Sequence, residues 1–261
     1  MATSRPATRK PVLRKALRSA LERPLPPGTD GMERLCLPLA GEVSVRWRRN
    51  GRARRVSLRI DLRAGAVAVT LPPRAGREAG LALLREHDGW VAARLAALPA
   101  AIGFAEGALV PVEGVPHRIR HVPDGRRGVW IEADEIRVSG DPCFLGRRVA
   151  DYLRREARTR LLGRVQSAVR GSGAPAPRRL AIKDTSSRWG SCSSDGTVML
   201  SWRLLMAPPA VQDYVVAHEL AHLRHLDHGT AFWRLVEQLT PHRAHAEAWL
   251  KRFGPELLRT G

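Results

Sequence analysis

The run His218-Glu219-Leu220-Ala221-His222 combines two imidazoles and one carboxylate at a spacing that suits hydrolytic metal chemistry. On a helix, His218 and His222 lie one turn apart on the same face, so both can reach one tetrahedral ion. Glu219 projects beside that ion instead of onto it, where it can take a proton from a water molecule that the ion has made more acidic. The run therefore predicts a catalytic metal site with Glu219 as general base.

A catalytic zinc ion takes three protein ligands and keeps one open position, so the run needs a third ligand. His225 would share the helix face, but it would lie about 10 Å along the axis from His218 if the helix continued. Asp227-His228-Gly229 is typical of a turn, and His228 follows His222 by six residues, the interval of the extended metzincin motif. We therefore predict His228 as the third ligand.

Two glutamates remain alternatives for the third ligand. Glu237 and Glu247 both follow the histidine run, and some zinc hydrolases take a carboxylate from a later helix. A site without catalysis, closed by four cysteine or histidine ligands, fits this pattern less well than an open catalytic site.

The second half of the chain predicts mainly helices that would position this run. Apolar residues from Val149 to Val165 recur at helical spacing and predict a long amphipathic helix that ends before Gly171. The remaining elements are predicted as strands at 180–183 and 197–202 around a polar loop at 185–196, a helix opened by Pro208-Pro209 that carries the histidines, and helices at 230–239 and 243–253, the last closed by Gly254-Pro255.

The first half predicts short strands. Apolar and polar residues alternate at 43–46 and again at 56–60, and Asn50-Gly51 between them predicts a two-residue hairpin turn. The further elements are predicted as a strand at 66–71, one helix at 77–98, and weaker strands at 109–112, 117–122, 129–132 and 136–138. Strands followed by helices indicate the α+β fold class.

Composition limits the class of protein. The net charge is +19, and almost all of the positive charge comes from arginines spread along the chain. This distribution favours a solvated basic surface, and it is also compatible with a nucleotide or nucleic acid as a partner. No apolar stretch approaches the roughly 18–20 residues that a membrane span requires. Three widely separated cysteines form no disulfide framework, so we expect a cytoplasmic protein.

Four segments together resemble a known family. They are Ser187-Arg188-Trp189-Gly190-Ser191-Cys192, Leu200-Ser201-Trp202-Arg203-Leu204, Asp213 to Leu223 with the histidine run, and His228-Gly229-Thr230-Ala231-Phe232-Trp233. The sequence is similar to the YgjP-like metallopeptidases, which are related to the WLM and SprT-like zinc proteases. The likeness is close over about residues 185 to 250. Ser201 and Gly229 stand where the family usually has asparagine and serine, and neither position is a proposed ligand.

The resemblance implies a zincin-like domain with zinc (Zn²⁺) held by His218, His222 and His228, and Glu219 as base. We therefore predict a flexible basic tail at 1–31, a strand-rich region at 32–142 and a zincin-like metallopeptidase domain at 143–261. The substrate would be a peptide or protein, bound along the strand at 197–202 as a sheet edge.

Two other functions remain open. A metal-dependent nucleotide phosphohydrolase would gather Arg188, Arg203 and Arg224 around the ion. A nucleic-acid-associated metalloprotein with little turnover would present one continuous basic face. Arg188 has two interpretations, since it could bind an oxyanion or substrate carboxylate, or it could pair within the fold while Trp189 and Cys192 pack under the metal-binding helix.

Overall fold

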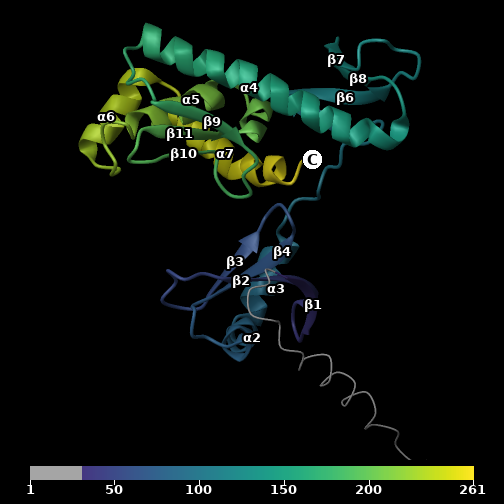
Figure 1. Ribbon diagram of the computed structural model, residues 1–261, viewed down its shortest axis with the longest axis vertical. Helices are drawn as coiled ribbons and strands as arrows, with labels where there is room; N and C mark the ends of the chain where they lie inside the picture. The colour runs from purple at the N-terminus through teal and green to yellow at the C-terminus, as the bar shows by residue number, and fades with distance from the viewer. Residues whose placement is uncertain (1–30) are drawn as a thin grey trace, which may run out of the picture. The chain divides into compact units, whose positions relative to one another are not determined.

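The computed structural model describes residues 31–261, which form two compact units (Figure 1). The first unit comprises residues 31–60 and 66–96, and the second comprises residues 61–65 and 97–261. Small sheets and helices make up both, so the predicted α+β class is confirmed. The predicted tail at 1–31 lies outside the described residues, except for Gly31. Between residues 31 and 261, no helix has both the length and the apolar character needed to cross a membrane.

The first unit is a four-stranded sheet with two helices on one face. The strand order is β1-β2-β4-β3, with bounds β1 Met32–Leu37, β2 Gly41–Arg49, β3 Ser57–Asp61 and β4 Ala66–Leu71. The helices are α2, Arg77–Glu86, and α3, Asp88–Ala96. Their core side chains meet those of the strands in one apolar cluster around Trp47 and Leu84. A Cβ at Gly80 would lie 2.5 Å from the Trp47 ring, so this glycine lets α2 pack closely on the sheet.

Two predictions for this unit were wrong. β2 and β3 do not form a hairpin, because β4 lies between them and pairs in parallel with β2. A two-residue type I′ turn needs positive φ at both central residues, and neither Asn50 nor Gly51 has it. The predicted single helix at 77–98 is interrupted at His87, and at this break the Asp88 carboxylate accepts hydrogen bonds from the backbone N–H groups of Leu39 and Ala40 at 2.7 and 2.9 Å.

The second unit contains two sheets joined by a long helix. One sheet has the order β5-β6-β8-β7, with bounds β5 Leu109–Val112, β6 Val115–His121, β7 Val129–Glu132 and β8 Glu135–Val138. The other has the order β10-β11-β9, with bounds β9 Arg179–Lys183, β10 Gly190–Cys192 and β11 Thr197–Ser201. After the short 3₁₀ turn η1, Pro142–Phe144, helix α4, Leu145–Gly171, runs from the first sheet to the second (Figure 1).

The remaining helices surround α5, the helix that carries the histidine run. The bounds are η2 Trp202–Met206, a 3₁₀ helix, α5 Pro209–Ala221, α6 Thr230–Leu239 and α7 Arg243–Leu258. α5 packs against α4, α6, α7 and the β10–β11 hairpin, so most of its side chains are buried. The predicted end of the last helix at Phe253 was wrong, because α7 continues through Pro255 to Leu258.

The predicted boundary between residues 142 and 143 lies inside the second compact unit, because α4 packs on β7 and β8 as well as on α5 and η2. It was placed where predicted strands give way to predicted helices, and as the start of a zincin-like domain it stays a prediction.

A buried arginine ties the end of the chain to the second unit. The Arg203 side chain is fully buried, donates to the Asp184 carboxylate and to the backbone carbonyls of Thr260 and Gly261, and stacks on the Trp202 ring. Asp184 also pairs with the more exposed Arg154. Since a buried guanidinium must keep its counter-charge, Asp184 holds this corner together.

We expect Asp184→Ala to destabilise the protein by about 3 kcal/mol, because it leaves the buried Arg203 charge unpaired. Arg154→Ala is the matched control. It removes an exposed partner of the same carboxylate and should cost no more than about 1 kcal/mol. Urea unfolding followed by circular dichroism measures both, and equal destabilisation by the two variants would contradict this role of Asp184.

Candidate metal centre

The candidate centre lies where α5 ends. Pro209 begins the helix, as predicted, and places His218 in its last turn and His222 at its C-cap. Beyond the helix the chain makes a tight turn, in which the N–H of Arg224 donates to the carbonyl of Ala221 at 3.0 Å. The chain then returns, and His228 reaches the face of α5 just before α6 begins.

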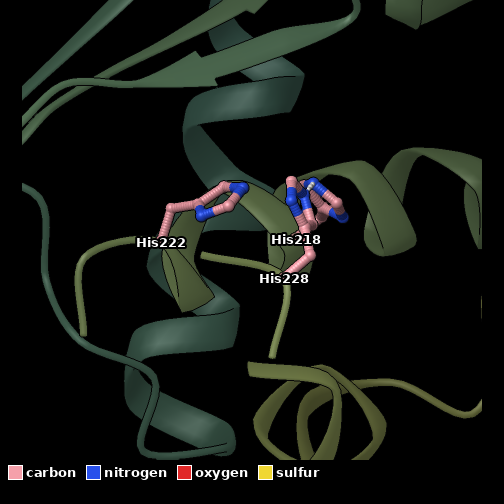
Figure 2. A group of neighbouring side chains, drawn as sticks. All are labelled: His218, His222 and His228. Atoms are coloured by element: carbon pink, nitrogen blue, oxygen red, sulfur yellow. Dashed lines mark hydrogen bonds between the residues drawn. The ribbon is translucent and has the colours of Figure 1, made fainter. Parts of the chain in front are cut away.

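The three imidazoles face one another (Figure 2). One ligand nitrogen from each of His218, His222 and His228 lies within 4.8 Å of the others. The Nε2 atoms of His218 and His228 are 3.2 Å apart. Zinc–nitrogen bonds of about 2.0–2.1 Å at tetrahedral angles place ligand nitrogens about 3.3 Å apart, so this spacing fits one tetrahedral ion.

The local environment keeps the imidazoles of His218 and His222 in the form that binds metal. Burial, with smaller contributions from the neighbouring histidines, lowers the pKa of His218 to about 4. Burial also lowers the pKa of His222, although its hydrogen bond to a backbone carbonyl opposes this shift. Metal ligation requires neutral imidazole, and both shifts favour it. The Nδ1 of His222 lies 2.9 Å from the carbonyl oxygen of His225, to which it donates, and this leaves Nε2 free for a metal ion.

The donor set discriminates among metals. Three imidazole nitrogens suit zinc and other late first-row divalent ions, whereas magnesium and calcium prefer oxygen ligands. Three ligands also leave one position open on a tetrahedral ion, as in catalytic zinc sites. The residues present therefore fit a catalytic transition-metal ion.

Glu219 follows His218 on α5 and lies in a water-poor environment. Its side chain is buried, and this burial raises its pKa to about 7, while the positive charge of Arg188 acts in the opposite direction. The backbone of Gly190 in β10 passes directly over the carboxyl group. A Cβ at this position would lie 2.5 Å from both Cγ and Oε1 of Glu219, so only glycine leaves room for the carboxylate.

A chain of contacts supports His218 from behind. The hydroxyl of Tyr214 lies 3.5 Å from Nδ1 of His218 and donates a 2.8 Å hydrogen bond to Oε1 of Glu247. Arg243 donates to the same Glu247 oxygen at 3.3 Å and lies over the Trp233 ring, 3.6 Å from its centroid. Because the hydroxyl proton of Tyr214 points to Glu247, the hydroxyl oxygen of Tyr214 can accept the Nδ1 proton of His218. The Nε2 atom of His218 then keeps its lone pair for a metal ion.

The other candidates from the sequence have different positions. His225 contributes its backbone carbonyl to the site, Glu237 pairs with Arg243, and Glu247 binds Tyr214. The geometry therefore favours His228 as the third ligand, and its binding of metal stays a prediction.

The segment from Ser187 to Cys192, which leads into and includes β10, has a packed part and an exposed part. Trp189 and Cys192 are partly buried against the apolar core, and the Trp189 ring contacts Gly254 of α7. Arg188 is exposed. Sequence analysis missed the roles of Gly190 and Tyr214. Tyr214 precedes His218 by four residues, so helical spacing could have indicated it.

Comparison with known proteins identifies the family. A family model described as "YgjP-like, metallopeptidase domain" matches residues 54–253. The chain belongs to the YgjP-like family. The resemblance noted in the sequence is therefore confirmed, and YgjP-like membership implies a hydrolase of the metallopeptidase class that uses a divalent metal ion.

Other comparisons add little to the YgjP-like assignment. The crystal structure of the metallopeptidase zymogen of Pyrococcus abyssi abylysin is 23% identical and matches 36% of this chain and 95% of that chain, with a TM-score of 0.33. A TM-score of this size supports no structural inference. No curated protein matched the chain.

We expect His228→Ala to weaken zinc binding by orders of magnitude, since it removes one of three ligands. His225→Ala is the matched control, because His225 contributes only its backbone carbonyl and the substitution keeps that group. Competition with a chromophoric chelator measures the zinc affinity of each variant. Equal affinities, with loss in Glu237→Ala or Glu247→Ala instead, would assign the third ligand to a carboxylate.

We expect Tyr214→Phe to lower zinc affinity by about 10–100-fold, the usual cost of losing a group that orients a metal-bound histidine. Tyr152→Phe provides the control, because Tyr152 lies on α4 and the chain has only these two tyrosines. The same chelator competition measures both variants, and the visible spectrum of the cobalt-substituted protein should shift only for Tyr214→Phe. Tyr214 has no orienting role if both variants bind zinc as the wild type does.

Proposed function

We propose that this chain is a zinc-dependent metallopeptidase in which His218, His222 and His228 hold the zinc ion and Glu219 is the general base. One observation carries the proposal. Three imidazole nitrogens gather within 4.8 Å of one another, and Glu219, the residue after His218 on α5, has a buried carboxyl group that is not one of the three. Catalytic zinc sites of hydrolases combine three protein ligands with a separate carboxylate in this way.

Glu219 would move the protons of the reaction. When bound, zinc would polarise the scissile carbonyl and make a neighbouring water molecule more acidic. Glu219 would accept the proton of that water and later deliver it to the nitrogen of the leaving amine. Burial supports both steps, because a carboxylate whose pKa is raised to about 7 holds a proton more firmly than an exposed one.

The sheet beside the site offers an edge for an extended peptide. We expected β11 to form this edge, but β11 lies between β9 and β10, so β9 and β10 are the edge strands and β10 is the one next to Glu219. The N–H of Ser201 donates to the carbonyl of Trp189, and Ser193 donates to Thr197. Because hydrogen-bonded pairs alternate in an antiparallel ladder, the backbone groups of Gly190 and Cys192 point outward from the sheet.

A peptide added to this edge would lie close to the general base. Gly190 contacts Glu219, so main-chain hydrogen bonds to Gly190 and Cys192 would bring a scissile bond next to the carboxylate. Recognition through main-chain groups selects for an extended chain more than for particular side chains. Unfolded or flexible polypeptide is therefore the proposed substrate class.

The nucleotide phosphohydrolase alternative has less support. It requires arginines around the metal, and Arg203 is instead fully buried against Asp184 and the chain end.

The three cysteines are free, as a reducing compartment such as the cytoplasm would favour.

We expect Glu219→Gln to retain zinc and to lower hydrolysis of an unfolded polypeptide by at least about 10²–10⁴-fold, the usual contribution of a general base. The amide is nearly isosteric, so thermal unfolding and zinc content should match the wild type. Glu237→Gln is the control, since Glu237 is an exposed residue of α6 and should keep full turnover. Wild-type turnover in zinc-loaded Glu219→Gln protein would show that the activity arises elsewhere.

A further inference from the structure

The first unit carries a disproportionate share of the positive charge. Its described residues, 31–60 and 66–96, include twelve arginines and five acidic residues, whereas the much larger second unit has 25 basic and 18 acidic residues. The sequence of residues 1–30, which directly precedes β1, adds seven basic and two acidic residues. The first unit and the segment before it therefore have a higher density of positive charge than the second unit.

The arginines of the first unit are arranged on the sheet face that its helices leave uncovered. Side chains alternate along a strand, so residues flanking those that pack on α2 and α3 must point to the other face. In β1 and β2, Leu35, Val45 and Trp47 lie in the core with the helices. Arg34, Arg46 and Arg48 therefore point to the opposite face. In β3, Leu58 and Ile60 pack on the core, so Arg59 between them points the same way.

We call these four residues, Arg34, Arg46, Arg48 and Arg59, the basic sheet face. The strand order β1-β2-β4-β3 distributes them across the whole sheet. Adjacent strands are about 4.8 Å apart, so the face extends about 14 Å from β1 to β3. Its uncharged members in β4, Ala68 and Thr70, are small and leave the surface flat.

Acidic side chains of this unit are mostly used elsewhere. Glu33 pairs with Arg77 and accepts a hydrogen bond from Trp47 on the helix side, and Asp88 is bound by two backbone N–H groups. Among the described strand residues of this face, Glu42 of β2 and Asp61 at the end of β3 are acidic, and Glu42 pairs with Arg34. Arg48 and Arg59 are exposed. The connection from β2 to β3 adds Arg52, Arg54 and Arg55, which are also exposed.

We propose that the basic sheet face binds the phosphodiester backbone of nucleic acid. A flat array of arginines matches a repeating line of phosphates, because a guanidinium donates two parallel hydrogen bonds to a phosphate group. The two tryptophans among the described residues of this unit are Trp47, buried on the helix side, and Trp90 of α3. The face therefore has no aromatic side chain on which bases could stack, and its binding is independent of base sequence.

The test measures binding of the full-length protein to a fluorescent 24-base-pair duplex, once as DNA and once as RNA, across a salt series. Each phosphate neutralised contributes about −0.9 to the slope of log K against log salt, so the wild type should give about −3 or steeper. Replacing both Arg48 and Arg59 by glutamate should weaken binding at least tenfold and reduce the steepness of the slope by about two. The milder change of both to serine should give a smaller loss in the same direction.

The matched control changes the charge equally on the helix side of the same unit. Arg85 of α2 and Arg94 of α3 are both exposed, and replacing both by glutamate should leave affinity and slope near the wild-type values. Equal weakening by the two double variants would overturn the proposal, because net charge alone would then explain binding. It would also be overturned if neither duplex bound at low salt, if the Arg48 and Arg59 variants bound normally, or if phosphatidylserine vesicles or polyglutamate competed as well as unlabelled duplex.

Discussion

The end of α5 at Ala221 is the constraint on which the candidate metal site depends. A continuing helix would carry the chain away from His218 at 1.5 Å per residue, and no third imidazole from the helix could return to the same ion. Because the helix stops and the chain turns at Arg224, His228 comes back to the face that His218 and His222 share. The turn performs a second task, since the carbonyl of His225 holds the ring of His222.

The rest of the second unit keeps that helix end in place. α5 is buried on nearly every side, by α4, α6, α7 and the β10–β11 hairpin, so its axis cannot shift without opening the core. α7 contributes twice, because Glu247 binds Tyr214 behind His218 and Gly254 receives the ring of Trp189. Trp189 immediately precedes Gly190, and so α7 also supports the strand that covers Glu219. One helix thus steadies both the ligand side and the base side of the site.

Sequence analysis predicted best where a feature depends on residues close together in the chain. The positions of His218, Glu219 and His222 follow from helical spacing, and the strands from 109 to 138 and the long helix over Val149 to Val165 follow from local patterns that the structure confirms. The prediction of His228 needed an added assumption about the turn. By contrast, β10 has three residues and no alternation, so a polar loop was expected where the structure has a strand.

The errors involve partners that are far apart in the sequence. Asn50-Gly51 has the composition of a hairpin turn, but β4 competes for the edge of β2 and wins it through a parallel pairing that no local pattern encodes. Similarly, the helix predicted at 77–98 is interrupted where Asp88 binds the turn at Leu39, 49 residues earlier. Arg203 was considered for the metal site, yet its partners are Asp184 and the last two residues of the chain.

The position of Gly190 over Glu219 makes the register of one short hairpin a condition for the site. The turn between β10 and β11 is held by Asp195, which accepts hydrogen bonds from the hydroxyl of Ser193 and from Thr197. A slip of one residue would replace Gly190 by Trp189 or Ser191, and either side chain would collide with the carboxylate. An insertion or deletion in this exposed turn would therefore displace Gly190, although loops of this kind usually tolerate such changes. The length of the turn is as much a part of the site as the histidines.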